Sequence, residues 1–184
     1  MLTFTKGWEG LKLWDMRTQV GIDTPGQDPI RRGPVSCVKW VTRPDELREI
    51  LCYGTGLGYL IVWVQNQRSG SFVEKTVQRL GTGQEITCIE KDPSMDADVR
   101  IVVGMRDRLV LLFSLDSRAQ LVNVFAVQLD NTVLKSVAFA DNDEDILVFG
   151  LYDGNVYVYA PCYLLEHSLM KHHLGIFSAE RMVK

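Results

Sequence analysis

The chain has 184 residues and a formal net charge of −3. Apolar residues make up 46% and charged residues 23% of the sequence, which is ordinary for a globular protein and argues against disorder. Nucleic-acid binders usually present a basic face, whereas Arg31-Arg32 is the only basic doublet that stands out here, so we expect no nucleic-acid partner.

Targeting segments are not apparent in the sequence. Residues 1–6 lack the long apolar stretch of a secretory signal, and no run approaches the roughly 18 apolar residues of a membrane span. We therefore expect a cytoplasmic or nuclear protein with no membrane partner.

The first half of the chain predicts short strands separated by loops. Residues 1–20 end in the strand-like Leu11–Trp14, which we interpret as the last part of an incomplete unit. Thr18–Pro34 is rich in Gly and Pro and predicts a long loop. Residues 35–80 predict four strands, at Val35–Trp40, Ile50–Gly54, Leu60–Trp63 and Phe72–Val77.

The second half repeats this pattern. Residues 85–130 predict strands at Ile86–Lys91, Ile101–Gly104, Val110–Phe113 and Leu121–Val127, and residues 133–160 predict them at Leu134–Phe139, Ile146–Gly150 and Val156–Tyr159. Beyond residue 160 the pattern changes. The apolar residues of Tyr163–Met170 have helical spacing, so for 161–184 we favour a short helix or an irregular tail over another strand.

Three markers recur in phase, at steps of 46–51 residues. They are an apolar position in the first strand (Val38, Ile89, Val137), a glycine ending the second (Gly54, Gly104, Gly150) and an aromatic ending the third (Trp14, Trp63, Phe113, Tyr159). Four antiparallel strands repeated at this spacing indicate β-propeller blades. The predicted fold is all-β, a partial β-propeller of three to four four-stranded antiparallel blades.

At this point the chain resembles the WD-repeat propeller family. Leu11-Lys12-Leu13-Trp14-Asp15 is similar to the family's closing strand with its Trp-Asp pair, and Asp153–Tyr159 is similar to the same element. Val38-Lys39-Trp40 and Val137-Ala138-Phe139 resemble its opening strand. The resemblance covers about residues 1–160 and implies a protein-binding scaffold.

The chain departs from the family at the polar positions of each blade. Gly81-Thr82-Gly83-Gln84 stands where the family often has Gly-His, and Tyr53, Val103 and Phe149 stand where it often has Ser or Thr. Asp107 and Asp153 keep the family's Asp without its expected partners. We therefore expect apolar packing to hold the blades and replacement of either Asp by Ala to change stability little.

The predicted blades are too few for a closed ring of typically four to eight. Two alternatives follow: the chain is a fragment of a larger propeller, or it needs another chain to complete the ring. In either case exposed blade edges favour association.

No catalytic, cofactor or metal site is predicted. The four cysteines form no CxxC pair, and we interpret them as buried thiols: Cys37, Cys52, Cys88 and Cys162. We interpret the three histidines as part of a solvated tail: His167, His172 and His173. Gly54–Gly58 runs into a strand, which indicates a hairpin turn, not a phosphate-binding loop. We assign three tryptophans to the core: Trp14, Trp40 and Trp63. For Trp8 both a core and a rim position are open.

The sequence thus favours a non-enzymatic scaffold that binds other proteins. The alternatives are a propeller enzyme whose site lies on further blades, since fold does not fix function, and a non-functional truncated copy.

Overall fold

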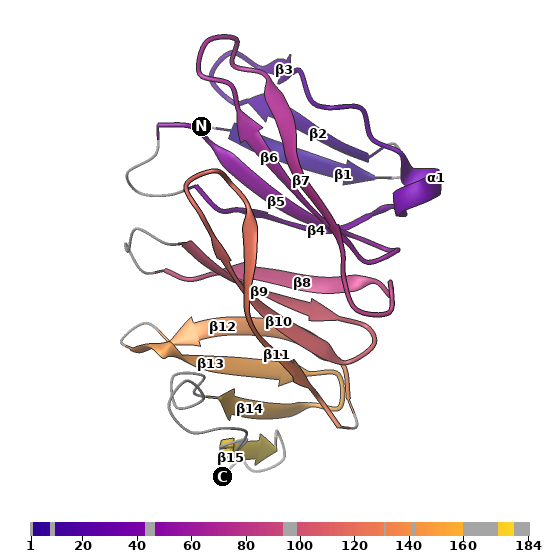
Figure 1. Cartoon of the computed structure of the whole chain (residues 1–184), viewed down its shortest axis with the longest axis vertical. Helices are drawn as coiled ribbons and strands as arrows, with labels where there is room; N and C mark the ends of the chain where they lie inside the picture. Colours follow the sequence, from indigo (N-terminus) through magenta and orange to yellow (C-terminus); the bar gives the residue numbers. More distant parts are fainter. Residues whose placement is uncertain are drawn as a thin grey trace.

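A computed structural model describes residues 2–7, 10–42, 47–93, 99–130, 132–140, 143–159 and 173–178. In these residues fifteen strands form four antiparallel sheets. The sheets follow one another along the long axis of the molecule, in chain order (Figure 1). The predicted all-β fold is confirmed.

The first sheet has three strands and the other three have four. The first contains β1 (Leu2–Gly7), β2 (Gly10–Asp15) and β3 (Val20–Ile22), and the second β4 (Val35–Trp40), β5 (Ile50–Thr55), β6 (Tyr59–Gln65) and β7 (Phe72–Arg79). The third contains β8 (Ile86–Lys91), β9 (Val99–Met105), β10 (Leu109–Leu115) and β11 (Leu121–Gln128), and the fourth β12 (Leu134–Ala140), β13 (Asp143–Leu151), β14 (Asn155–Tyr159) and β15 (His173–Ser178).

The last strand lies in the segment for which we favoured a helix or an irregular tail. β15 pairs antiparallel with β14, so the fourth sheet continues past residue 160. A strand here covers the edge of β14, which otherwise presents unpaired backbone groups. The helix expected at Tyr163–Met170 falls outside the described residues. At the other end, β3 extends the first sheet to Ile22.

Neighbouring sheets meet where the first two strands of one sheet pack on the first strand of the next, and the recurring glycines lie there, on the second strands β5 and β9. A Cβ on Gly54 would be 2.6 Å from Ile86 Cβ, and a Cβ on Gly104 would be 2.6 Å from Leu134 Cδ2. The same two residues of the following sheet accept hydrogen bonds through their carbonyls: Ser36 Oγ donates to Ile86 O (2.7 Å), and Thr87 Oγ to Leu134 O (2.8 Å). Glycine thus lets the next sheet approach, and a hydroxyl fixes it there.

Apolar clusters fill the space between successive sheets. One joins the first and second sheets around Leu13 and Trp63, one joins the second and third around Val62 and Phe113, and one joins the third and fourth. Each cluster is shared, so no sheet buries its apolar side chains alone, as expected of a repeat architecture.

The closing-strand aromatics show what such sharing requires. Trp63 and Phe113 are 0% and 1% exposed because each packs against the preceding sheet. Trp14 holds the same position in the first sheet and is 39% exposed, so its assignment to the core is wrong for this chain. Among the described residues, no sheet covers Trp14 as the first sheet covers Trp63.

The glycine contact gives a direct stability test. Gly54→Ala should lower the free energy of unfolding by about 2–3 kcal/mol, because the added methyl overlaps the Cβ of Ile86 in a packed core. Gly26→Ala is the matched control: no atom lies within 4 Å of the place its Cβ would take, so the change should be neutral or stabilise by up to about 1 kcal/mol. Urea unfolding followed by circular dichroism measures both; equal effects would contradict the close-approach explanation.

Candidate interaction surfaces

The three cysteines in the described part of the chain are unreactive thiols. Cys37, Cys52 and Cys88 are free, and burial raises the pKa of Cys37 to about 12 and that of Cys88 to about 11. Burial raises the pKa of Cys52 as well. A thiol is nucleophilic only as the thiolate, so these three are packing residues. Cys162, His167 and His172 lie outside the described residues.

Within the described ranges no three His, Cys, Asp or Glu side chains come together as a metal site. No helix there is long and apolar enough to cross a membrane. The Gly54–Gly58 segment is the turn between β5 and β6, which pair as a hairpin. Trp40 packs on Phe72, with ring centroids 6.1 Å apart, and Trp8 is not among the described residues.

The loop between β3 and β4 is fixed at several points. The Gln27 side chain exchanges two hydrogen bonds of 2.7 Å with the backbone of Leu11, one to its N–H and one to its carbonyl. Arg32 Nη1 donates to Glu74 Oε2 of β7 at 2.6 Å. Asp28 caps the short helix α1 (Pro29–Arg32) by accepting from Arg31 N. A Cβ at Gly33, whose φ is +82°, would lie 2.7 Å from Leu57 N, so the loop also rests directly on the β5–β6 turn.

This fixed loop presents apolar surface to solvent. Ile30 of α1 is 90% exposed, and Leu57, on the turn against which Gly33 packs, is 41% exposed. Arg31 lies next to Ile30 and is also exposed. In Figure 1 α1 projects from one end of the strands. We call Ile30, Arg31 and Leu57 the loop patch.

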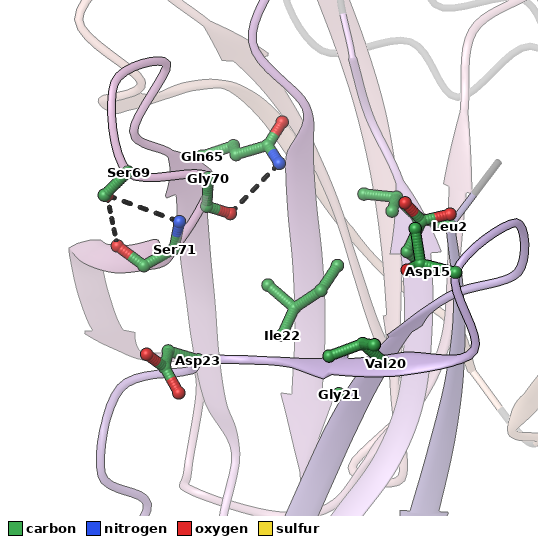
Figure 2. A pocket seen from close by; sticks show the side chains of 11 residues that line it. Leu2, Asp15, Val20, Gly21, Ile22, Asp23, Gln65, Ser69, Gly70 and Ser71 are labelled. Atoms are coloured by element: carbon green, nitrogen blue, oxygen red, sulfur yellow. Dashed lines mark hydrogen bonds between the residues drawn. The ribbon is translucent and has the colours of Figure 1, made fainter.

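The opposite end of the strands carries two grooves beside the β6–β7 turn. The first, of about 340 Å³, lies between this turn and the first sheet and is lined by Leu2, Asp15, Thr18, Val20, Gly21, Ile22, Asp23, Gln65, Ser69, Gly70 and Ser71. Figure 2 shows Asp15 and Asp23 at opposite ends of β3, with Val20 and Ile22 between them. Its described lining contains two carboxylates and no cation. We call it the acidic groove.

The second groove has the opposite charge. It measures about 390 Å³ and is lined by Arg48, Val64, Gln65, Asn66, Gln67, Arg68, Val73 and Lys75. Three of these residues are cationic and, among the described lining, none is acidic. Gln65 belongs to both grooves, so the turn separates them. We call this one the basic groove. Sequence reasoning missed both grooves, because their residues are brought together only by the folded turns.

Solved structures share this arrangement of sheets. The chain matches the Myceliophteria thermophila Cps50 (Swd1) β-propeller domain with a TM-score of 0.70 at 14% identity, over 96% of this chain and 55% of that one. It matches Saccharomyces cerevisiae Sqt1 with 0.67 at 13%, over 95% and 50%. A chain of the mitotic checkpoint complex matches with 0.65 at 15%, over 92% and 44%.

Its fold is that of part of a β-propeller, and the chains that it matches are WD40 propeller proteins. The chain spans about half the length of the solved chains it matches, and each sheet is one blade. No protein-family model and no curated protein sequence matches the chain.

The polar contacts of the blades differ from our expectation at one site. Asp107, in the β9–β10 turn, has partners: Thr82 donates to its Oδ2 from Oγ (2.7 Å) and from N (3.1 Å), and Leu109 N donates to Oδ1 (3.3 Å). Thr82 is part of the segment that replaces the family's Gly-His. For Asp153 the hydrogen bond is local, from Asn155 N at 3.1 Å. One turn therefore keeps an inter-element polar contact with a new donor.

The second blade lacks such a network at its Trp. Trp63 Nε1 is buried and, among the described residues, has no hydrogen-bond acceptor. Tyr53, which occupies the place of the family's Ser or Thr, meets the Trp63 ring edge-on at 5.0 Å between centroids. Aromatic packing thus substitutes for the polar contact there.

These contacts predict different effects of the two Asp replacements. Asp107→Ala should destabilise the chain by about 1–2 kcal/mol, because it leaves Thr82 and Leu109 without their acceptor, whereas Asp153→Ala should change stability by less than about 0.5 kcal/mol. Partial burial raises the pKa of Asp107, but the hydrogen bonds from Thr82 and Leu109 together outweigh it and hold the pKa below its ordinary value.

The effect of Asp107 on stability therefore depends on pH. The pKa of Asp107 is lower in the folded state than in the unfolded state, where it is about 3.9, so ionised Asp107 stabilises the fold at pH values above about 3.9. This stabilisation is lost as the pH falls through the folded-state pKa. The difference between wild type and Asp107→Ala in urea unfolding should accordingly be full near neutral pH and shrink in acid. A difference that grows in acid, or equal effects of the two replacements, would contradict the assigned contacts.

Proposed function

We propose that the chain is a protein-interaction scaffold, part of a WD40 propeller that binds a partner protein through the loop patch. The observation that supports this is a loop attached at three separate places, to Leu11, Glu74 and the β5–β6 turn, that carries an apolar residue 90% exposed to solvent. The attachments hold the loop in one conformation. A side chain that contacts only water does not need a loop held in this way.

A loop that is already fixed before a partner arrives is pre-organised for binding. Ordering a mobile loop on association opposes binding, by about 0.5–1.5 kcal/mol for each immobilised side chain, and a loop that is already fixed avoids much of this. An aliphatic residue beside an arginine also combines apolar burial with a polar contact, and arginine is enriched at interfaces. The loop patch therefore suits a partner surface with an apolar pocket and an acidic rim.

Charge reversal of the apolar contact tests the proposal. The full chain is used to capture proteins, each captured protein is purified, and its dissociation constant is measured with wild type and with Ile30→Glu. We expect binding to weaken at least about tenfold, because a buried charge replaces a buried methyl surface. Val122→Glu introduces the same charge at another exposed apolar residue, on β11, and is expected to leave binding unchanged.

Three outcomes oppose the proposal. Equal binding by wild type and Ile30→Glu would place the interface elsewhere, and equal loss in both variants would indicate non-specific capture. A protein that has no partner and is unstable in its native cells would support the truncated-copy alternative. The free thiols of Cys37, Cys52 and Cys88 favour a reducing compartment, and we propose a cytoplasmic or nuclear location.

We propose further that another blade covers the Trp14 face, from elsewhere in a longer protein or from another chain. Trp63 and Phe113, at the same repeat position, are covered by the blade that precedes each of them. The chain alone should therefore self-associate, and Trp14→Glu should shift its sedimentation towards the monomer. Trp14→Phe is the control that keeps the apolar face. A stable, soluble monomer of the wild-type chain would count against the proposal.

A further inference from the structure

The turns that join the third and fourth strands of successive blades repeat one local structure. Asp15 Oδ1 accepts from Arg17 N (2.9 Å), Asn66 Oδ1 from Arg68 N (2.9 Å), and Asp116 Oδ1 from Arg118 N (2.8 Å). In each turn an Asp or Asn accepts from the backbone of an arginine two residues later. Asn and Asp both form this Asx turn, so the backbone does not select between them.

The charge of the turn does depend on that choice. In the first and third blades the accepting side chain is a carboxylate, which offsets the positive charge of the arginine. In the second blade the neutral Asn66 leaves the charge of Arg68 without a carboxylate in its own turn. Within the described part of the chain the exposed Arg68 side chain is in no ion pair.

A second cation reaches the same place through a β-bulge. Thr76 pairs with Val62 and Glu74 with Trp63, so Lys75, between them, opposes no residue of β6. β11 has its bulge at the corresponding place, where Val124 lies between Phe125 and Asn123. A bulge redirects the side chain that it carries. Lys75 is exposed, lines the basic groove, and is also in no ion pair within the described residues.

The groove offers more than charge. The exposed Val73 provides apolar wall, and the exposed Gln67 provides an amide that can pair with an extended backbone. The amides of Gln65 and Asn66 also line the groove, although Gln65 Nε2 already donates to Gly70 O and Asn66 Oδ1 already accepts from Arg68 N. Its volume of about 390 Å³ falls in the range of ligand sites, roughly 300–1,000 Å³. The chain as a whole carries a net charge of −3, whereas the described lining of this groove has three cations and no carboxylate.

We propose that the basic groove binds an acidic peptide segment of a partner protein, with Asp or Glu side chains at Arg68 and Lys75. This site lies at the opposite end of the strands from the loop patch and does not depend on it. A single exposed ion pair contributes little, about 0–1 kcal/mol. The affinity therefore comes from two pairs acting together with the apolar wall and the amides, and it falls as added salt screens the charges.

A long polyanion such as a nucleic acid fits this surface less well. On the other side of the same turn lies the acidic groove, with Asp15 and Asp23 (Figure 2). A phosphate backbone that extended across the turn would meet these carboxylates, whereas a short peptide can end or change its charge there. The peptide is therefore the occupant that the charges favour.

The test uses the full chain and fluorescein-labelled hexaglutamate, with hexalysine and a short oligothymidylate as competing probes, followed by fluorescence anisotropy at low salt. Wild type should bind hexaglutamate in preference to the other two. The double variant Arg68→Glu/Lys75→Glu should weaken this at least about tenfold, and Arg68→Lys/Lys75→Arg should retain it. Circular dichroism checks that each variant is folded.

Arg118→Glu is the matched control. It reverses the same charge in the equivalent turn of the next blade, where Asp116 already supplies a carboxylate, and it should leave binding unchanged. Equal weakening by Arg118→Glu, tighter binding of the oligothymidylate, or no binding of hexaglutamate by the wild type would each overturn the proposal. Ile30→Glu should bind hexaglutamate as wild type does, so failure at the loop patch and failure at this groove are told apart.

Discussion

The close approach of each blade to the first strand of the next is the constraint on which the rest of this structure depends. It needs a residue without a Cβ at Gly54 and Gly104, since a methyl there would overlap Ile86 or Leu134. It also needs a hydroxyl one residue into the first strand, on Ser36 and Thr87, to pair with the same two residues' carbonyls. Because the contact recurs, the shared apolar clusters recur with it, and blades stack instead of standing alone.

This constraint explains why the repeat was readable from the sequence. Only a few residue types fit each of the recurring positions. The glycine leaves room for the neighbouring blade, the aromatic fills the cluster between two blades, and the first strand needs apolar side chains because it packs between blades. They therefore recur at a nearly constant spacing even where the polar signature of the WD family is absent. The fold class and the succession of four-stranded units follow from such local restrictions.

What the sequence did not predict depends on contacts between segments far apart. The Asp107–Thr82 bond joins a turn of the third blade to the link that precedes that blade, and Thr82 gave no signal because it lies in a segment that lacks the family's Gly-His. The fourth strand of the last blade was missed because residues 160–172 separate it from β14, unlike the short turns elsewhere. Trp14 was placed in the core because its repeat position is a core position; its exposure depends on which blades are present. The loop patch and the grooves likewise exist only once distant turns meet.

A repeat protein supplies its own reference for separating structural from functional residues. Where equivalent positions agree, as in Gly54 and Gly104, the fold accounts for the residue. Where they differ without a structural reason, another explanation is needed. Asn66 makes the same turn as Asp15 and Asp116, so the missing carboxylate changes the electrostatic field while the backbone is unchanged. Ile30 also has no counterpart elsewhere in the repeat. It lies on the short helix α1, and in the described chain the links between the later blades contain no such helix. The two surfaces proposed for binding are thus the places where the second blade and its linker depart from the pattern that stacking requires.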